Sequence, residues 1–472
     1  MLIKFILLIF LMPYFFSMII FPFKTALNNI ESDNIDYNLT NFLNDYYSQP
    51  AYMTLKIGNP SQEVNVLLTY NDCGFKIGKA KNCINNDNYL SYYNRNSSTD
   101  FKYTDLFNKS SMEFRNGRSA EDSIYAYTDL DMKKLQKFEN IGFYLGTDTN
   151  DPLCGIIGFT YGYFKLYCDE MNNIFTSFKM REIVNNNDWM LKYTSNNEGL
   201  LIFNPDLSKI VNNYDFNKLF ITNNEKSFQP GLWTLSINKV YSNNVNGSII
   251  NKPQNADINN DFGLIEGSGE YYYNITKTFF RDYILEGICY LEEVKAGMFY
   301  YYYAIECDKK KFGKEDLEKF PTLSLVVISL QTEFILDYND LFTETEYKYF
   351  FNVIFHKFVT DKWVLGKPFL KKYPLIINYD AQTIGYYNDD IEDQSKDKKA
   401  KNHIISESFL IIIIIIIIIL IIIVSITCYF IGKNLNKTKK RKANELDDDY
   451  DYSSSKDEDN NLLNEEFKTI NK

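Results

Sequence analysis

Apolar and polar residues alternate along most of the stretch between about 50 and 390. In segment 52–57 every second residue is apolar, and segment 233–237 repeats this pattern. Such alternation is typical of β-strands with one buried face. Helical patterns are confined to two short candidates, 279–286 and 344–356, and no regular succession of strands and helices is visible. The pattern therefore predicts a mainly β protein.

Both ends of the chain depart from this alternation. Residues 1–23 contain one early lysine followed by an apolar run, which is the pattern of a secretory signal peptide. Residues 409–431 form one long apolar span, and about 20 such residues are enough for a helix to cross a bilayer. Basic residues follow this span at once, and positive charge stays on the cytoplasmic side; they are Lys433, Lys437, Lys439, Lys440, Arg441 and Lys442. We therefore expect a single-pass type I membrane protein of the secretory or endosomal pathway or the cell surface, with a lumenal or extracellular ectodomain.

The composition argues against several classes of function. The chain of 472 residues has a formal net charge of -11, which offers no basic surface to phosphate backbones, so we expect no nucleic acid as a partner. Its only histidines, His356 and His403, are too few to suggest Ser-His or Cys-His catalysis or a histidine metal site. We expect no metal and no cofactor. The four tyrosines at 300–303 fit a chain that is rich in tyrosine throughout, and we interpret them as compositional background.

Cysteines and glycosylation sequons fit an ectodomain in an oxidising compartment. The cysteines before the apolar span are even in number, which suggests disulfides between neighbours in sequence: Cys73, Cys83, Cys154, Cys168, Cys289 and Cys307. Within the predicted ectodomain, sequons for N-glycosylation begin at five asparagines: Asn38, Asn96, Asn108, Asn246 and Asn274.

Four motifs follow one another along the predicted ectodomain. They are YMTLKIGNPSQ at 52–62, LCGIIGFTY at 153–161, GLLIF at 199–203 with WTLSI after it, and WVLGKPFLKKY at 363–373. In content and in order these motifs resemble those of the pepsin-like aspartic peptidases. The resemblance covers roughly 48–388. It implies a bilobal, mainly β fold with a cleft between two β lobes that accepts an extended peptide.

The resemblance and the two ends together predict the organisation of the chain. The predicted parts are a signal peptide (1–23), a short N-terminal segment (24–47), an N-terminal lobe (48–195), a C-terminal lobe (196–390), a juxtamembrane linker (391–408), one transmembrane helix (409–431) and a cytoplasmic tail (432–472). Segment 24–47 lacks the basic prosegment that masks the acidic pair in zymogens of the family.

The resemblance implies that each lobe contributes one carboxylate and that the two carboxylates share a proton. The first acid lies seven residues after the glutamine of the opening turn, and counting from Gln62 leads to Thr69. A threonine hydroxyl cannot hold the shared proton, so this substitution should abolish the mechanism. Asp72, followed by Cys73 and Gly74, is the alternative first acid if three residues are inserted.

The second lobe departs from the family pattern as well. The segment FGLIEGSGE at 262–270 places Glu266 at the second acid position, one methylene longer than aspartate. In the flap, Phe114 stands where the family has a tyrosine hydroxyl. The resemblance also implies a disulfide between Cys289 and Cys307, as in the hairpin of the family's second lobe.

The tail contains one candidate sorting signal. Glu458 lies four residues before the pair Leu462 and Leu463, a spacing that resembles the dileucine signals read by adaptor complexes. The alternative is an accidental apolar pair in a charged, solvated tail.

These observations favour a membrane-anchored protein of this family that is catalytically inactive and binds a polypeptide through its cleft or lobe surface. One alternative is an active aspartic-type endopeptidase that uses Asp72 and Glu266. A second alternative is an adhesion or structural surface glycoprotein.

Overall fold

The computed structural model describes residues 18–25, 37–70, 72, 74–78, 93–104, 117–146, 155–160, 173–226, 231–243, 248–296, 300–358 and 360–389. The chain divides into two compact units, Met1–Asp389 and Asp390–Lys472, and every described residue belongs to the first unit. Several predictions lie outside these ranges: the span 409–431, Cys73, Cys83, Cys154, Cys168, Asn108, Asn246, Phe114, Glu458, Leu462 and Leu463.

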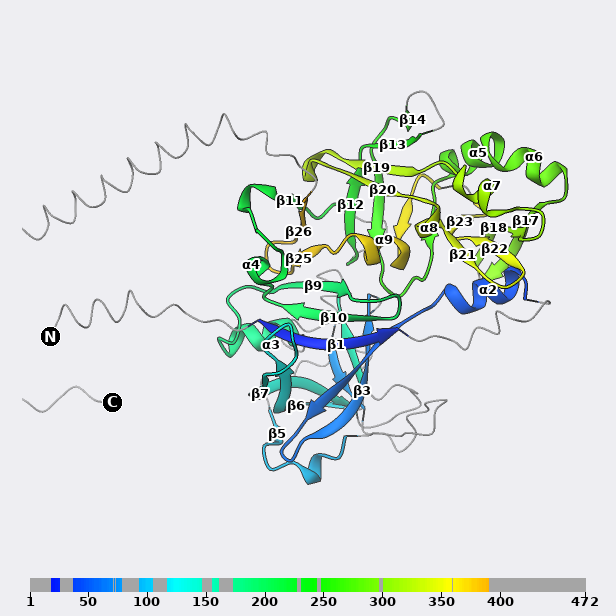
Figure 1. Cartoon of the computed structure of the whole chain (residues 1–472). Helices are drawn as coiled ribbons and strands as arrows, with labels where there is room; N and C mark the ends of the chain where they lie inside the picture. Colours follow the sequence, from blue (N-terminus) through cyan, green and yellow to red (C-terminus); the bar gives the residue numbers. More distant parts are fainter. Residues whose placement is uncertain are drawn as a thin grey trace, which may run out of the picture. The chain divides into compact units, whose positions relative to one another are not determined.

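The prediction of a mainly β protein is confirmed (Figure 1). The largest sheet has 13 strands. In spatial order they are β11 (Leu219–Asn223), β26 (Thr383–Tyr387), β25 (Ile376–Asn378), β9 (Asp188–Tyr193), β10 (Glu198–Phe203), β1 (Ile19–Thr25), β2 (Ala51–Ile57), β3 (Gln62–Thr69), β8 (Gly155–Gly158), β4 (Phe75–Ile77), β7 (Leu135–Gly146), β6 (Gly117–Tyr127) and β5 (Lys102–Tyr103). We call the strands from β2 to β5 in this spatial order the first lobe; they are β2, β3, β8, β4, β7, β6 and β5.

The second lobe has a nine-stranded and a four-stranded sheet. The nine-stranded sheet contains β12 (Trp233–Ile237), β15 (Gln254–Ile258), β24 (Trp363–Leu365), β16 (Ile265–Glu266), β23 (Val353–His356), β18 (Tyr300–Asp308), β22 (Lys348–Phe351), β21 (Phe342–Glu344) and, paired with β18, β17 (Cys289–Ala296). The four-stranded sheet is β14 (Ser248–Ile250), β13 (Lys239–Ser242), β19 (Leu323–Val327) and β20 (Thr332–Leu336).

The helices are short and lie between strands. The α-helices are α2 (Leu39–Tyr46), α3 (Ile174–Met180), α4 (Leu207–Ile210), α5 (Gly269–Thr278), α6 (Phe280–Leu285), α7 (Lys314–Glu318), α8 (Tyr338–Leu341) and α9 (Lys367–Lys372), and the 3-10 helices are η1 (Arg95–Ser97), η5 (Phe216–Lys218) and η6 (Ile328–Leu330). None of the helices in the described ranges has the length and hydropathy of a membrane span.

The alternating pattern at 52–57 becomes β2, whose apolar residues point into the core. The candidate helix at 279–286 is confirmed as α6, but the one at 344–356 is wrong, because this segment forms β22 and β23. Its residues are buried on both faces of the sheet, so the period of two that identifies a strand is hidden. Aromatic and β-branched residues there favour the strand.

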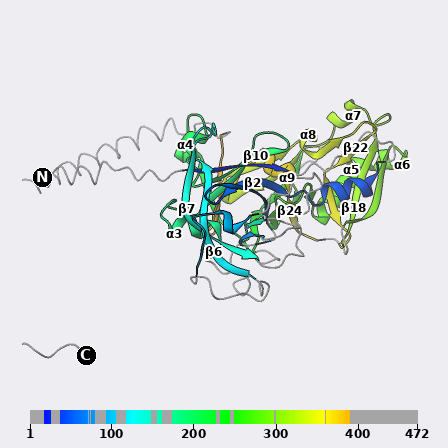
Figure 2. The same cartoon turned by 90° about the horizontal axis from the view of Figure 1, so that it is seen from below.

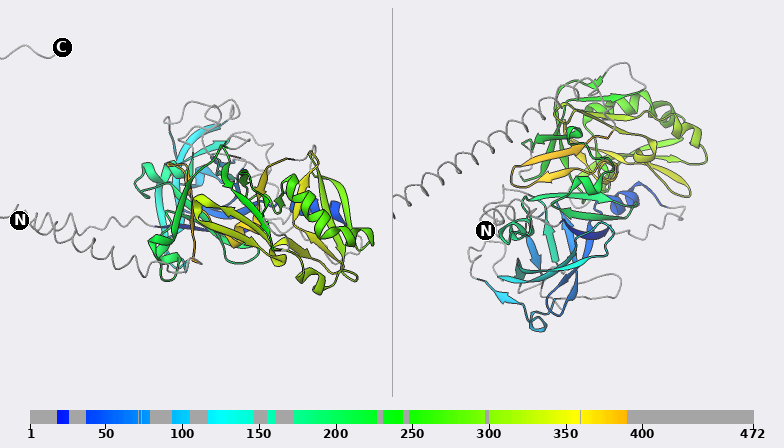
Figure 3. Two further views of the ribbon diagram at one scale, coloured as in Figure 1. Left: turned by 90° about the horizontal axis from the view of Figure 1, so that it is seen from above. Right: turned by 60° about the vertical axis from the view of Figure 1, so that its left-hand side comes forward.

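The chain before residue 48 contributes two elements to the described fold. Strand β1 pairs with β10 along its length, next to the green strands in the right-hand view of Figure 3. The signal peptide stays a prediction, and a cleavage after residue 23 would remove most of β1. Helix α2, blue in Figures 1 and 2, packs on the second lobe beside β18, where the Phe42 ring stacks on Phe350 with centroids 4.5 Å apart.

Both lobes contain the same arrangement of strands around a turn. In the first lobe, β3 and β8 are parallel, β4 and β8 antiparallel, and β4 and β7 parallel. In the second lobe, β15 and β24 are parallel, β16 and β24 antiparallel, and β16 and β23 parallel. The turn between β3 and β4 is therefore the topological equivalent of the turn between β15 and β16.

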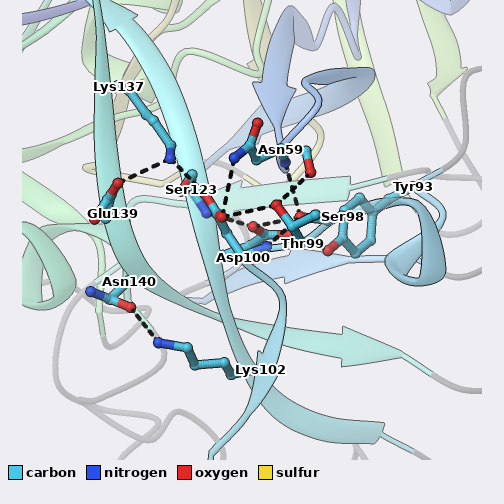
Figure 4. A network of polar contacts seen from close by, with 11 residues as sticks. Asn59, Tyr93, Ser98, Thr99, Asp100, Lys102, Ser123, Lys137, Glu139 and Asn140 are labelled. Carbon is cyan, nitrogen blue, oxygen red and sulfur yellow. Dashed lines mark hydrogen bonds and ion pairs between the residues drawn. The ribbon is translucent and has the colours of Figure 1, made fainter.

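A polar network holds the opening turn of the first lobe (Figure 4). Asp100 accepts hydrogen bonds from Ser123 Oγ at 2.7 Å and Asn59 Nδ2 at 3.2 Å, and the Lys137 ammonium lies 2.7 Å away. The Lys137 and Ser123 donors hold the pKa of Asp100 well below its usual range. The network ties the turn that contains Asn59, between β2 and β3, to strands β6 and β7.

The disulfide between Cys289 and Cys307 is confirmed. It joins directly paired residues at the ends of β17 and β18. Of the sequon asparagines in the described ranges, Asn38 and Asn96 are exposed, whereas Asn274 is half-buried in α5.

Candidate functional site

The two equivalent turns meet at one hydrogen-bonded contact. The Oγ1 hydroxyl of Thr69, at the end of β3, donates a hydrogen bond to Asp261 Oδ2 at 2.5 Å. The backbone N–H of Tyr70 donates to the same oxygen at 3.0 Å. Asp261 lies in the turn between β15 and β16, so the contact joins residues from the corresponding turns of the two lobes. A hydroxyl and one carboxyl group therefore occupy the point where the turns meet.

Asp261 is buried, with 7% of its surface exposed. Burial raises its pKa to about 6, although the hydrogen bonds from Thr69 and Tyr70 favour the ionised form. The buried Lys367, next to Gly366, opposes this shift through its charge, and burial in turn lowers the pKa of Lys367 to about 7. The carboxyl group can thus exchange a proton near neutral pH.

The structure places Asp261, rather than the predicted Glu266, opposite Thr69. Glu266 lies beyond the turn, on β16. Asp261, Phe262 and Gly263 form an Asp-x-Gly string within this turn. The pattern of two apolar residues, an acid and a glycine selects Glu266, because Leu264 and Ile265 precede it, whereas Asp261 follows Asn259 and Asn260.

Close packing fixes the turn around Asp261. A Cβ at Gly366, in the closing motif, would overlap the backbone oxygens of Phe262 and Leu264. A Cβ at Gly263 would overlap the backbone oxygen of Tyr46. Both glycines are needed because backbone segments approach from two sides and leave no room for a side chain.

Residues 46–49 form one of these segments, and we call them the crossing segment. Gly263 N donates to Tyr46 O at 3.0 Å, and Gln49 N donates to Asp261 O at 2.8 Å. The Lys367 ammonium donates to Gln49 O. The predicted N-terminal segment therefore extends to the site through backbone hydrogen bonds, which its sequence does not reveal.

A cavity of about 420 Å³ opens beside Asp261. It is lined by Tyr47, Ser48, Leu232, Asp257, Asn259, Asp261, Phe262, Glu266, Tyr300, Tyr302, His356, Thr360, Lys362 and Val364. Burial raises the pKa of Glu266, and the charge of Lys362 opposes this shift. Lys362 itself is paired with Asp257, whose Oδ2 lies 2.6 Å from the ammonium.

The alternative first acid lies in a different environment. The Asp72 carboxylate contacts the Lys76 ammonium at 2.6 Å and accepts from Gly74 N at 3.2 Å. The residues that line the cavity do not include Asp72. Thus the structure brings together Thr69, Asp261 and the cavity that contains Glu266, but it does not bring Asp72 to them.

Metal ligands were not expected from the sequence. Across the part of the chain that the structure describes, no group of three or more His, Cys, Asp or Glu residues could hold a metal ion.

The sheets, the two equivalent turns and the contact between them define a two-lobed, mainly β fold. The chain is similar in structure to basic 7S globulin from soybean (TM-score 0.50, 13% identity), to conglutin gamma, a unique basic 7S globulin from lupine seeds (0.52, 11%), and to edgp (0.51, 11%). Each match covers 79% of this chain and 95% of the solved chain. At these identities the likeness shows the fold alone. No protein-family model matches the chain, and no curated protein matches its sequence.

Proposed function

We propose that this chain is a catalytically inactive protein of the pepsin-like fold that binds a polypeptide, and that the span 409–431 anchors it to a membrane. The observation that supports inactivity is the contact between Thr69 and Asp261. Aspartic peptidases activate water with two carboxyl groups that share one proton. Here the group that faces Asp261 is a hydroxyl. It donates a hydrogen bond to the carboxylate but cannot act as the second acid or base.

Two features support the binding of a polypeptide. The cavity beside Asp261 lies within the ~300–1,000 Å³ of typical ligand sites, and its walls combine aromatic rings with carboxylates. The fold itself places this cavity next to the meeting point of the two turns. Because binding of a polypeptide requires no catalytic step, it is compatible with a threonine in place of a carboxyl group at residue 69.

The alternative of an active endopeptidase with Asp72 and Glu266 has less support. A shared proton requires two carboxyl groups in contact, whereas Asp72 forms an ion pair with Lys76 and Glu266 lines the cavity without it. The exposed sequons at Asn38 and Asn96 are equally compatible with a surface glycoprotein that does not use the cavity.

A cleavage assay tests the proposal of inactivity. Full-length protein in detergent is incubated with a peptide library from about pH 3 to about pH 7, the range in which carboxyl pairs work, and products are identified by mass spectrometry. We expect no more cleavage than with the Asp261→Asn variant. Pepstatin-sensitive cleavage that Asp261→Asn removes would contradict the proposal. Cleavage that survives this change but disappears in Asp72→Asn and in Glu266→Gln would favour the alternative peptidase.

A localisation experiment tests the proposed anchor and tail. A tagged chain should be retained by membranes after alkaline extraction, whereas a chain that ends at residue 390 should be released. Replacement of Leu462 and Leu463 by alanine should shift the tagged protein toward the cell surface without changing its amount. An unchanged distribution would leave the tail without a sorting role.

A further inference from the structure

Five aromatic rings line the cavity that contains Glu266, and four of them are Tyr47, Tyr300, Tyr302 and His356. The Tyr302 ring centroid lies 5.5 Å from that of Tyr47 and 5.4 Å from that of His356. The Tyr300 ring lies 6.5 Å from Tyr302 and 6.3 Å from His356. The rings therefore form a cluster on one side of a cavity whose lining also contains a carboxylate.

Strand geometry explains how the run of tyrosines supplies two of these rings. Successive side chains on β18 point to opposite faces, so Tyr300 and Tyr302 share one face. Tyr301 and Tyr303 point to the other face, where the Tyr303 ring stacks on that of Tyr272 with centroids 5.5 Å apart. Our interpretation of the run as compositional background is therefore wrong for Tyr300 and Tyr302.

The charges that line the cavity leave a negative excess. Asp257, Asp261 and Glu266 line it, and Lys362 is the only lysine or arginine among the lining residues. The Lys362 ammonium is already held by Asp257 at 2.6 Å.

The His356 Nδ1 lies 3.1 Å from the backbone N of Phe358 and 3.2 Å from its carbonyl oxygen. The three carboxylates of the lining outnumber its lysine and its histidine together. A cation is therefore the ligand that the charges of the cavity favour.

We infer that this cavity binds the ammonium group of a lysine side chain, with the tyrosine rings against the cation and the Glu266 carboxylate as its counter-charge. Aromatic faces attract cations because their π-systems carry negative charge on the face, and the attraction grows when water is excluded. The inference rests on the proposed binding of a polypeptide and names the side chain that the site recognises. The entrance is open at Tyr300, which is 47% exposed.

The primary experiment needs no variant. Two short peptides that differ only in lysine or norleucine at one position are titrated into the full-length protein in detergent by calorimetry. Norleucine keeps the four-carbon chain but lacks the ammonium. We expect the lysine peptide to bind at least about tenfold more tightly, a ratio within the range of a desolvated cation on aromatic faces. The same pair is tested as Nα-acetyl-N-methylamides to separate the side chain from the peptide backbone.

Matched variants locate the site. Glu266→Gln keeps the shape of the side chain and should reduce the lysine preference to less than about threefold, because only the charge is lost. Tyr300→Ala should weaken binding of the lysine peptide at least about threefold. Tyr301→Ala is the control, since Tyr301 is 41% exposed, lies next in sequence and belongs to the other face of β18. The Tyr301→Ala variant should bind the lysine peptide with the affinity of the unchanged protein.

The outcomes separate this inference from the proposed function. Equal affinity for the two peptides, or a lysine preference that Glu266→Gln leaves intact, overturns the lysine site while polypeptide binding stands. If the Nα-acetyl-N-methylamide of lysine binds in preference to that of norleucine but neither peptide binds, the lysine site stands and polypeptide binding is wrong. If no probe binds, both are wrong.

Discussion

In the first lobe, the turn between β3 and β4 presents the Thr69 hydroxyl to the other lobe and keeps its carboxylate, Asp72, paired with Lys76. In the second lobe, the equivalent turn buries Asp261, and its backbone packs against the crossing segment and against Gly366 of the closing motif. The same arrangement of strands therefore supports two different environments for a carboxyl group. Strand topology alone does not make a catalytic pair, because the residue at the meeting point decides the chemistry.

The largest effect is expected at the packing of the second-lobe turn. Gly366→Ala should lower the free energy of unfolding by at least about 4 kcal/mol, because the added Cβ overlaps the backbone oxygens of Phe262 and Leu264. Urea unfolding followed by tryptophan fluorescence measures this loss. Gly313→Ala is the control, since nothing lies within 4 Å of its Cβ position, and it should cost less than about 1 kcal/mol. Similar costs for both variants would show that the turn tolerates displacement.

A second carboxylate at the meeting point should be the next most costly change. Thr69→Asp brings a like charge against Asp261 and should destabilise the fold by about 3–5 kcal/mol near pH 7.5. At about pH 4.5 the cost should be smaller, because two adjacent carboxyl groups can share one proton. Thr69→Asn has the same size without the charge and should show no such relief on acidification. A loss for Thr69→Asp that is independent of pH would contradict the contact.

Removal of the hydroxyl should have a smaller effect that depends on pH. Asp261 has a pKa of about 6 in the fold and 3.8 when unperturbed. The stability that its proton contributes is therefore complete below about pH 4 and is lost as the pH rises through about 6.

Above that range Asp261 is ionised and accepts a charge-assisted hydrogen bond from Thr69. Thr69→Val should then cost about 2 kcal/mol near pH 7.5 and about 1 kcal/mol near pH 4.5, as measured by unfolding at both values. Thr54→Val, which removes an exposed hydroxyl from β2, should stay within about 0.5 kcal/mol at either pH. Equal losses for Thr69→Val at the two pH values would count against an ionised Asp261.

The first-lobe carboxylate should matter least. Asp72→Asn and Lys76→Met should each cost no more than about 1 kcal/mol, because ion pairs near the surface contribute little. In a double-mutant cycle, the coupling of the pair should stay below about 1 kcal/mol. A cost above about 3 kcal/mol for Asp72→Asn would indicate that this carboxylate is buried with a role comparable to that of Asp261.

Much of the fold could be predicted from local sequence. The alternation at 52–57 and 233–237 became β2 and β12, and the closing motif at 363–373 became β24 and α9. The Cys289–Cys307 bridge follows the resemblance. The segment 344–356 failed as a helix because its strands are buried on both faces, which removes the alternation that distinguishes them from a helix.

The candidate site could be predicted only in part. Thr69 could be predicted because it lies seven residues after Gln62 within the same strand, β3, where the spacing is fixed. Asp261 does not follow from the sequence pattern because two asparagines, not two apolar residues, precede it, and only the turn between β15 and β16 brings it to Thr69. Tyr300 and Tyr302 were missed because a run of four tyrosines contains no signal of which face is buried.

The sequence by itself determined the β character of the ectodomain, the order of its motifs and the absence of an acid at residue 69, since each depends on residues close together in the chain. Tertiary structure alone decided that Asp261 faces Thr69, 192 residues away, and that the crossing segment lies on the second-lobe turn. It also decided which tyrosines line the cavity that contains Glu266. The physical reason is that local patterns reflect hydrogen bonding and burial within single elements, whereas contacts between lobes arise from the packing of whole sheets, which no short stretch of sequence encodes.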